Sequence, residues 1–297
     1  MPELPDLTLY IEKLQERILN ARIEKINLTA PFFLRSVDPP LREAEGKLIR
    51  GFERIGKRIV WKLEDDLALV FHLMIAGRFH WKKRGTKPPG KVGLAAFDFD
   101  VGTLLVTEAS VKKRASLHLI RGEDSLAQFD RGGIEMFSVR FEEFRSALTR
   151  ENHTLKRCLT DPRLFSAIGN AYSDEILHAA RLSPLQQSKN LSDQEIRRLF
   201  EATQNTLKFW IDRLRKQVGN GFPEKVTAFH EEMAVHGRYR RPCPVCRTPV
   251  QRIVYAENEC NYCPRCQTNG KILADRSLSR LLKDDWPRTV EELEEMY

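Results

Sequence analysis

The sequence predicts an α+β protein, in which an N-terminal antiparallel β-sandwich with a helix at its amino end precedes a helical region with a cysteine-rich hairpin. Strand-like runs dominate the first half of the chain and helical periodicity the second, while five of six cysteines fall between Cys243 and Cys266. The chain has 297 residues, 41% of them hydrophobic and 30% charged. This length and composition allow two domains, each with its own core.

The first element is a helix that begins almost at the amino terminus. Apolar residues at spacings of three and four, from Leu4 to Ile18, predict it over about residues 5–19. The preceding "MPELPD" places a proline second in the chain. If an aminopeptidase removes Met1, Pro2 becomes a secondary amine, which is a nucleophile. Alternatively, Pro2 or Pro5 merely occupies a first helical turn, where a missing N–H costs nothing.

Strand-like runs separated by turn signals follow the helix. They are "KRIVWKLE", "LALVFHLMI", "GRFHWKK", "LAAFDFD", "TLLVTE" and "ASLHLI". This pattern predicts an antiparallel sandwich over about residues 20–135. Lys57 follows a glycine just before a strand, beside Arg54 and Arg58. It is either a solvated lysine or part of an anion-binding groove.

Helical patterns begin after about residue 140. They are "FEEFRSALTR", "LTDPRLFSAIGNAYSDEILHAARL", "SDQEIRRLFEATQNTLKFWIDRLRKQ" and, beyond the cysteines, "SLSRLLKDDW". Ser192 and Glu195 have the spacing of a capping box. Gly169 and Asn170 interrupt the second pattern, where backbone amides and the Asn170 side chain can hold a phosphate at a helix N-terminus. A simple corner between two helices explains this pair about as well.

The cysteine spacing indicates a metal site. Two CxxC pairs, sixteen residues apart, supply four thiolates and predict one structural zinc with a closed tetrahedral shell held by Cys243, Cys246, Cys263 and Cys266. Such a metal would hold a hairpin that has too little core to fold without it. Cys260 forms a second CxxC with Cys263 and is an alternative ligand. Cys158 lies on an apolar helical face and is expected in the core.

Charge and hydropathy narrow the class of protein. Lys and Arg number 49 against 41 Asp and Glu, a net charge of +8 that favours a polyanionic partner such as nucleic acid. No run approaches the roughly eighteen apolar residues of a membrane span, and the N-terminus lacks a signal-peptide pattern. We expect a cytoplasmic enzyme that is not associated with a membrane.

In combination, these motifs resemble the formamidopyrimidine-DNA glycosylase and endonuclease VIII family of base-excision repair enzymes. The chain carries them in the family's order: "PELPD", "GKR", "HLMIAGR", "LKRCLTDPRLFSAIGNAYSDEIL", "AVHGR" and "CPVC…CPRCQ". The resemblance implies a bifunctional DNA glycosylase and abasic-site lyase that acts on oxidised bases in damaged DNA, double- or single-stranded. We expect a monomer associated with the nucleoid. A non-catalytic protein that recognises abasic or distorted DNA is the alternative, and a zinc-dependent hydrolase is disfavoured by the all-thiolate site.

The resemblance also implies domains and residue roles. The domains are a catalytic β-sandwich over 1–138, a helix-two-turns-helix domain over 139–236, a zinc finger over 237–267 and a tail over 268–297. Pro2 would attack C1′ of the damaged nucleoside, and Glu3 would act in acid–base steps at the sugar. Lys57 would hold a phosphate near the lesion, and Lys156 and Asn170 would hold flanking phosphates.

The sequence departs from the family in its first and helical motifs. Asp6 replaces the second glutamate of "PELPE", and Ala167 replaces the glycine before "IGN". About thirty residues also follow "CPRCQ", where many members end.

Larger departures fall on segments that would contact DNA. Ile75 stands where a methionine fills the space left by the flipped base, and Asn258 stands at the place of the finger arginine. "EASVKKRAS" replaces the segment that carries the intercalating arginine and phenylalanine. Within it, Val111 and Lys113 take their places, and Lys112, Lys113 and Arg114 would attract phosphates without reading sequence. We therefore expect weak discrimination of the opposite base and good activity on single-stranded DNA.

Overall fold

The computed structural model describes residues 1–224, 226, 229–255, 258–275, 279–281 and 286–295, with Tyr255 and Asn258 described by their backbone. The chain forms two compact units. The first comprises Met1–Arg131 and Trp210–Ala228, and the second comprises Gly132–Phe209 and Phe229–Tyr297. Helix α5 (Asp193–Val218) starts in the second unit and ends in the first.

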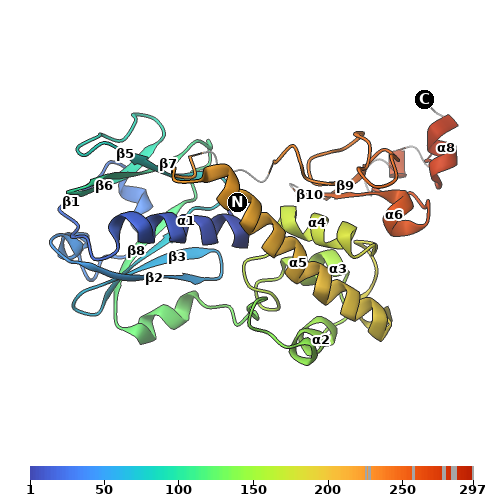
Figure 1. The fold of residues 1–297 in the computed structure, drawn as a ribbon, viewed down its shortest axis with the longest axis horizontal. Coiled ribbons are helices and arrows are strands. Elements are labelled where there is room, and N and C mark those ends of the chain that lie inside the picture. Colours follow the sequence, from blue (N-terminus) through green and yellow to red (C-terminus); the bar gives the residue numbers. More distant parts are fainter. Residues whose placement is uncertain (225, 227–228, 256–257, 276–278, 282–285, 296–297) are drawn as a thin grey trace. The chain divides into compact units, whose positions relative to one another are not determined.

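The first unit contains two four-stranded antiparallel sheets and one α-helix at the amino end, α1 (Leu4–Ile18) (Figure 1). One sheet has the strand order β1-β6-β7-β5 and the other β2-β3-β4-β8. The strands are β1 (Lys25–Leu28), β2 (Ile49–Ile55), β3 (Arg58–Leu63), β4 (Leu67–His72), β5 (Gly77–Lys82), β6 (Gly93–Phe99), β7 (Gly102–Glu108) and β8 (Ser116–Arg121). Short 3-10 helices are η1 (Pro31–Phe33), η2 (Leu41–Ala44) and η3 (Glu123–Phe129). The predicted sandwich with an N-terminal helix is confirmed.

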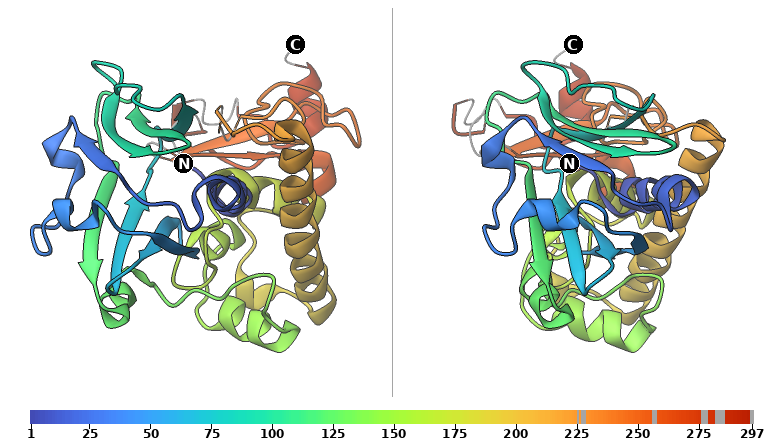
Figure 2. Two further views of the ribbon diagram at one scale, coloured as in Figure 1. Left: turned by 60° about the vertical axis from the view of Figure 1, so that its left-hand side comes forward. Right: turned by 90° about the vertical axis from the view of Figure 1, so that its left-hand side faces the viewer.

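An aromatic core joins the two sheets. The Trp61 ring, on β3, lies 4.7 Å from that of Phe71 on the neighbouring strand. It also lies 5.3 Å from the ring of Phe97 on β6, in the other sheet, and all three side chains are fully buried. Figure 2 shows the two sheets from two further directions. Aromatic residues at alternate strand positions thus face inward, as strand periodicity requires.

Strand prediction was least accurate where strands are polar or end early. The sequence pattern does not predict β1 or β2; β1 has one charged residue and β2 has three, and in β2 the register also shifts between Ile49 and Gly51. The run "LALVFHLMI" predicts one strand, but β4 ends at His72. A turn follows at once, because Met74 has a φ of 51° and the Gly77 N–H donates to the Leu73 carbonyl at 2.8 Å.

The second unit is helical and ends in a hairpin. Its described helices are α2 (Phe141–Thr149), α3 (Leu155–Thr160), α4 (Asn170–Ala179), α6 (Pro264–Thr268), α8 (Val290–Glu295), the 3-10 helix η4 (Ser188–Asn190) and the first part of α5. The hairpin pairs β9 (Gln251–Tyr255) with β10 (Asn258–Tyr262). At the start of α5, the Ser192 N–H donates to Glu195 Oε2 at 2.8 Å and the Glu195 N–H to Ser192 Oγ at 3.3 Å, which confirms the capping box. The predicted helix "SLSRLLKDDW" lies largely outside the described residues.

The pattern "LTDPRLFSAIGNAYSDEILHAARL" is interrupted before Asn170, as predicted. Helix α3 ends at Thr160, and α4 begins at Asn170. Between them Ala167 has a φ of 60°. This left-handed conformation costs a non-glycine residue about 1–2 kcal/mol. The backbone at the position of the expected glycine is therefore left-handed in this chain too, although alanine occupies it.

The C-terminal tail packs on the hairpin. The Leu273 N–H donates to the Tyr262 hydroxyl at 2.7 Å, and the Val254 N–H of β9 donates to the buried Asp275 carboxylate at 2.6 Å. The Val290 N–H donates to the Gly270 carbonyl at 2.9 Å. These described parts of the tail therefore extend the finger. None of the helices described is both long and apolar enough to cross a membrane.

Candidate active site and metal centre

The amino terminus forms a buried turn. Pro2, Glu3 and Asp6 are all buried, and Glu3 is the N-cap residue of α1. The Glu3 N–H donates to Asp6 Oδ2 at 2.9 Å, so the aspartate that replaces the family's glutamate closes the first helical turn. Burial raises the pKa of Asp6 to about 7. The turn therefore holds two buried carboxyl groups three residues apart.

Four charged groups surround the terminal amine. Burial is the largest cause acting on the pKa of the Met1 amine and lowers it; the negative charges of Glu3 and Asp6 raise this pKa, and the positive charges of Arg78 and Lys57 lower it. The net direction of the shift for Met1 is downward. Burial therefore favours the uncharged form of the amine of Met1, the residue directly before Pro2.

Lys57 reaches this site from a tight turn. It lies between the paired residues Ile55 of β2 and Arg58 of β3, after Gly56. Gly56 has a φ of 56°, a conformation that favours glycine. The Arg54 guanidinium donates to the Gly56 carbonyl at 2.8 Å and braces the turn. The glycine before Lys57 is therefore required by the hairpin that presents the lysine.

Sequence reasoning assigned no role to Arg78 or His72. The Arg78 guanidinium donates to the Gly77 carbonyl at 2.6 Å and the Ile75 carbonyl at 3.1 Å, at the turn after β4. Burial is the main cause that lowers the pKa of His72 to about 4, and Arg58, Lys57 and His118 add to it. Both residues lie within "HLMIAGR", but the spacing of residues in that motif does not predict that they lie near the amino terminus or Lys57.

Strand register brings Ile75 and Val111 to the same end of the sandwich. Gly77 of β5 is paired with Glu108 of β7, and His72 of β4 is paired with Ser116 of β8. Residues 73–76 connect β4 to β5, and residues 109–115 connect β7 to β8. Both segments therefore pass from one sheet to the other at the same end of the sandwich. Ile75 is 61% exposed and Val111 is fully exposed, so each segment presents an apolar side chain to solvent.

The buried Glu108 carboxylate holds the segment 109–115. It accepts hydrogen bonds from the N–H groups of Arg114 at 2.9 Å and Ala115 at 3.1 Å. Lys113 Nζ donates to the Glu108 and Lys91 carbonyls, each at 2.8 Å. The Lys113 ammonium thus turns back to the base of the segment, while Lys112 is exposed.

In the second unit, Lys156 and Asn170 contact protein groups. Lys156 Nζ donates to the Asp174 carboxylate and, at 2.7 Å, to the Asn170 carbonyl. Asn170 Nδ2 donates to the Glu259 carbonyl of β10 at 2.8 Å. Burial opposes ionisation of Asp174, but the charges of Lys156 and His236 hold its pKa below its ordinary value. The structure thus brings the two predicted phosphate ligands together beside a buried carboxylate.

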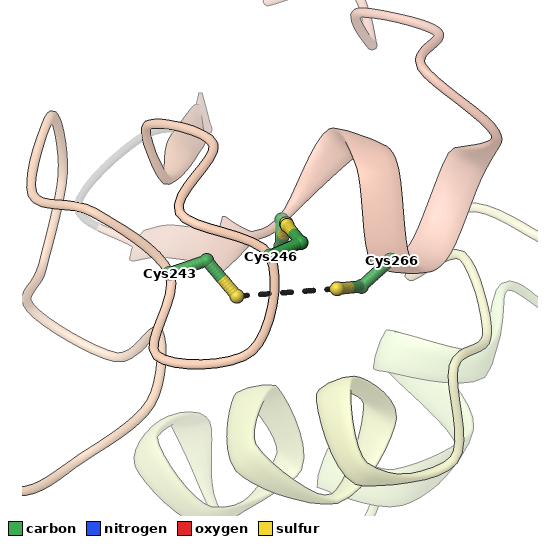
Figure 3. A group of neighbouring side chains, drawn as sticks. Cys243, Cys246 and Cys266 are labelled. Carbon is green, nitrogen blue, oxygen red and sulfur yellow. Dashed lines mark hydrogen bonds between the residues drawn. The ribbon is translucent and has the colours of Figure 1, made fainter.

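Four cysteines form a group that can hold a metal ion. The sulfurs of Cys243, Cys246, Cys263 and Cys266 all lie within 4.8 Å of one another. Those of Cys243 and Cys266 are 3.9 Å apart (Figure 3). Those of Cys246 and Cys263 are 3.3 Å apart. Sulfurs bound at 2.3 Å to a tetrahedral zinc are about 3.8 Å apart, so the donor set fits zinc. Cys260 is not part of the group.

The remaining predicted contact, Asn258, begins β10. Its side chain lies outside the described part of the chain.

Two family models match this chain. The formamidopyrimidine-DNA glycosylase N-terminal domain matches residues 1–112, and the formamidopyrimidine-DNA glycosylase H2TH domain matches residues 134–219. An uncharacterized formamidopyrimidine-DNA glycosylase-like protein of Mycobacterium tuberculosis is 38% identical over 151 residues, which cover 51% of this chain and 94% of that protein. The formamidopyrimidine-DNA glycosylase of Heliobacterium modesticaldum is 32% identical over 281 residues, which cover 90% of this chain and all of that enzyme.

Solved structures agree with these matches. A complex between the Lactococcus lactis Fpg and DNA containing an abasic site has a TM-score of 0.78 and 25% sequence identity, and the match covers 90% of this chain and 99% of that one. A complex of MutM with DNA containing carbocyclic 8-oxo-G also has a TM-score of 0.78, with 26% identity over 90% of this chain and all of that one. From its fold, its ordered motifs and its full-length relatives, this chain belongs to the formamidopyrimidine-DNA glycosylase and endonuclease VIII family.

Proposed function

We propose that this protein is a bifunctional DNA glycosylase and abasic-site lyase of base-excision repair that removes oxidised bases from damaged DNA. The observation that carries the proposal is the placement of the buried Pro2 in a turn with Glu3 and Asp6, next to an amino terminus on which the charges of Lys57 and Arg78 also act. The relatives named as formamidopyrimidine-DNA glycosylases and the Fpg structures with damaged DNA support the same class of reaction.

The chemistry begins when removal of Met1 frees the Pro2 nitrogen. This nitrogen forms a bond to C1′ as the bond between C1′ and the base breaks; the base leaves with the electron pair and takes up a proton. Opening of the sugar ring, with a proton delivered to O4′ from Glu3, gives an iminium ion between Pro2 and C1′. The iminium acidifies the C2′ proton, and loss of that proton expels the 3′ phosphate. The target nucleotide must leave the base stack to reach Pro2.

The positive groups act on the DNA backbone and on the amine. Lys57 is proposed to hold a phosphate near the lesion, and Arg78 stands beside the same amine. Lys156 and Asn170 are proposed to hold flanking phosphates, as are Lys112 and, less directly because of its internal contacts, Lys113. Ile75 and Val111 are proposed to occupy space left in the duplex, and Asn258 to lie near the lesion strand.

One zinc is proposed to complete the finger. It would be held by Cys243, Cys246, Cys263 and Cys266 and would supply no catalytic water, because four thiolates close its coordination shell. We propose that the protein acts as a cytoplasmic, nucleoid-associated monomer on double- or single-stranded DNA. The division into residues 1–138, 139–236, 237–267 and 268–297 is kept as a proposal for its functional parts.

Reductive trapping tests the proposal. Sodium borohydride reduces an iminium to a stable amine, so the protein incubated with DNA containing an abasic site should form a covalent adduct. Intact-mass measurement sorts preparations by the presence of Met1, and protein that retains Met1 is the matched control without a free Pro2 nitrogen. Peptide mapping should place the adduct on Pro2. Tight binding to abasic DNA without any adduct in Met1-free protein would instead identify a non-catalytic DNA-binding protein.

A further inference from the structure

One face of α4 carries three polar side chains that contact the cysteine-rich finger. Asn170, Asp174 and His178 are spaced by four residues and therefore lie along one side of the helix. Asn170 Nδ2 donates to the Glu259 carbonyl at 2.8 Å, and the Asn261 N–H donates to Asp174 Oδ2 at 3.1 Å. His178 Nε2 lies 3.3 Å from Cys243 Sγ. The face thus spans the distance from the predicted phosphate ligands to the metal site.

Asp174 is the centre of this face. Its carboxylate is completely buried, and its Oδ1 accepts the Lys156 ammonium of α3. Its Oδ2 accepts His236 Nδ1 at 2.8 Å as well as the Asn261 N–H. Lys156 in turn donates to the Asn170 carbonyl. One carboxylate therefore joins α3, the segment before the first cysteine pair, and strand β10.

Glu175, the next residue, fixes the segment that leads to the first cysteine pair. Its carboxylate accepts hydrogen bonds from three consecutive backbone N–H groups, those of Ala234 at 2.7 Å and of Val235 and His236 at 2.9 Å. His236 is thereby held both by its backbone and by its ring. Movement of residues 234–236 away from α4 would therefore break these hydrogen bonds.

We propose that Asp174 is a positioning residue that couples the finger to the phosphate-binding groups Lys156 and Asn170. Asp174 orients the Lys156 ammonium and, through it, the start of α4, while the same carboxylate anchors β10 and His236. The inference rests on the proposed function, because it concerns how the protein holds DNA. Under this inference, the finger and the helix-two-turns-helix element bind DNA as one unit, because Asp174 joins them.

The variant Asp174→Asn keeps the size of the side chain and breaks the network. Both carboxylate oxygens face donors, so the amide NH2 must oppose either Lys156 or the pair formed by His236 and Asn261. A donor facing a buried donor loses its hydrogen bond. The variant also removes one negative charge, which would tighten binding to DNA if charge were the only effect. A positioning role of Asp174 therefore predicts weaker DNA binding by this variant, whereas an effect of charge alone predicts tighter DNA binding.

The experiment measures the dissociation constant for a duplex that contains a reduced, uncleavable abasic site, at fixed salt. We expect Asp174→Asn to bind at least about tenfold more weakly. Asp161→Asn is the matched control: it removes the same charge at the end of α3, from an aspartate paired with the exposed Arg163, and should bind equally well or slightly better. We also expect Asn170→Ala to add little weakening to Asp174→Asn, because both act through one contact set.

The zinc content and circular dichroism of each variant show whether the fold is intact. Should Asp174→Asn not fold, His236→Phe replaces it, because it keeps a ring stacked on Phe229 and removes one donor to the carboxylate. Binding by Asp174→Asn that matches or exceeds wild type, or fully additive effects with Asn170→Ala, would overturn the inference. Wild-type protein that neither binds this duplex nor forms the borohydride adduct would instead contradict the proposed function.

Discussion

Glu3 and Asp6 share the first turn of α1, and we assign them different roles. Glu3 belongs to the proposed chemistry, because it lies directly after Pro2 and its charge acts on the terminal amine. Asp6 accepts the Glu3 N–H and is completely buried, so it shapes the turn. Each role leads to a separate measurement.

Glu3→Gln should abolish base excision and leave DNA binding nearly intact. The amide keeps the shape of the side chain but cannot deliver a proton, and positioned acid–base groups contribute about 10²–10⁴-fold to rate. The measurement is single-turnover excision of an oxidised base together with the dissociation constant for the same duplex. Glu16→Gln, an exposed glutamate on the same helix, is the matched control. An unaltered excision rate in Glu3→Gln would show that the role is wrong.

Asp6→Asn should change how stability depends on pH. The ordinary pKa of an aspartate is 3.8, and burial raises that of Asp6 to about 7. Between these values the folded protein holds a proton that the unfolded chain has lost, so this group's contribution to stability falls as pH rises. Asparagine still accepts the Glu3 N–H and does not titrate.

We therefore expect the free energy of unfolding of Asp6→Asn, relative to wild type, to improve by about 2 kcal/mol between about pH 5.5 and pH 8. Urea unfolding at both pH values measures this difference, and the titration of the cysteines cancels because both proteins share it. A difference that stays constant with pH would mean that Asp6 is ionised throughout the folded state.

At the scale of elements, the segment 109–115 is the one that we propose to contact duplex DNA. Glu108 and Lys113 hold the segment from within, which leaves Val111 as its exposed apolar tip beside Ile75. A small aliphatic tip cannot stack as an aromatic ring does. It can still fill part of the space left by a flipped nucleotide. Burial of a valine side chain there would stabilise the complex by about 1.5 kcal/mol.

Val111→Ser should therefore lower excision from duplex DNA about five- to tenfold and leave excision from single strands unchanged, because single strands have no stack to fill. Val101→Ser is the matched control, since Val101 is an exposed valine in another turn of the same sandwich. The assay compares one lesion in single strands and in duplexes with each of the four opposite bases. A strong preference of the wild-type protein for one opposite base would show that another segment reads that base.

At the scale of the whole molecule, the metal site should control the finger and its contacts. Zinc removal by a chelator, or Cys263→Ser, should unfold the hairpin and weaken DNA binding, because the metal replaces a core that the hairpin lacks. Elemental analysis should find about one zinc per chain. Cys260→Ser is the control, because Cys260 is outside the four-cysteine group, and it should keep its zinc. A metal-free protein with full DNA binding would contradict this assignment.

The predicted architecture succeeded wherever a local period was strong. Period-two runs gave the inner strands, three-to-four spacing gave α1 and α5, and the spacing of four cysteines gave the metal group. It did not identify β1 and β2. Polar edge strands and a backbone with positive φ at Ala167 depend on neighbours that a single stretch of sequence does not reveal.

The sequence by itself determined the inner strands, the proline in second position and the group of four cysteines, because each depends on residues a few positions apart. Only the tertiary structure decided that Arg78 stands at the terminal amine, that Lys113 turns inward, and that Lys156 meets Asp174. A lysine ammonium at the end of a flexible four-carbon chain can reach several partners, and the choice among them is made by residues distant in sequence that packing brings close. For this reason chemical groups could be recognised from the sequence, while their partners could not.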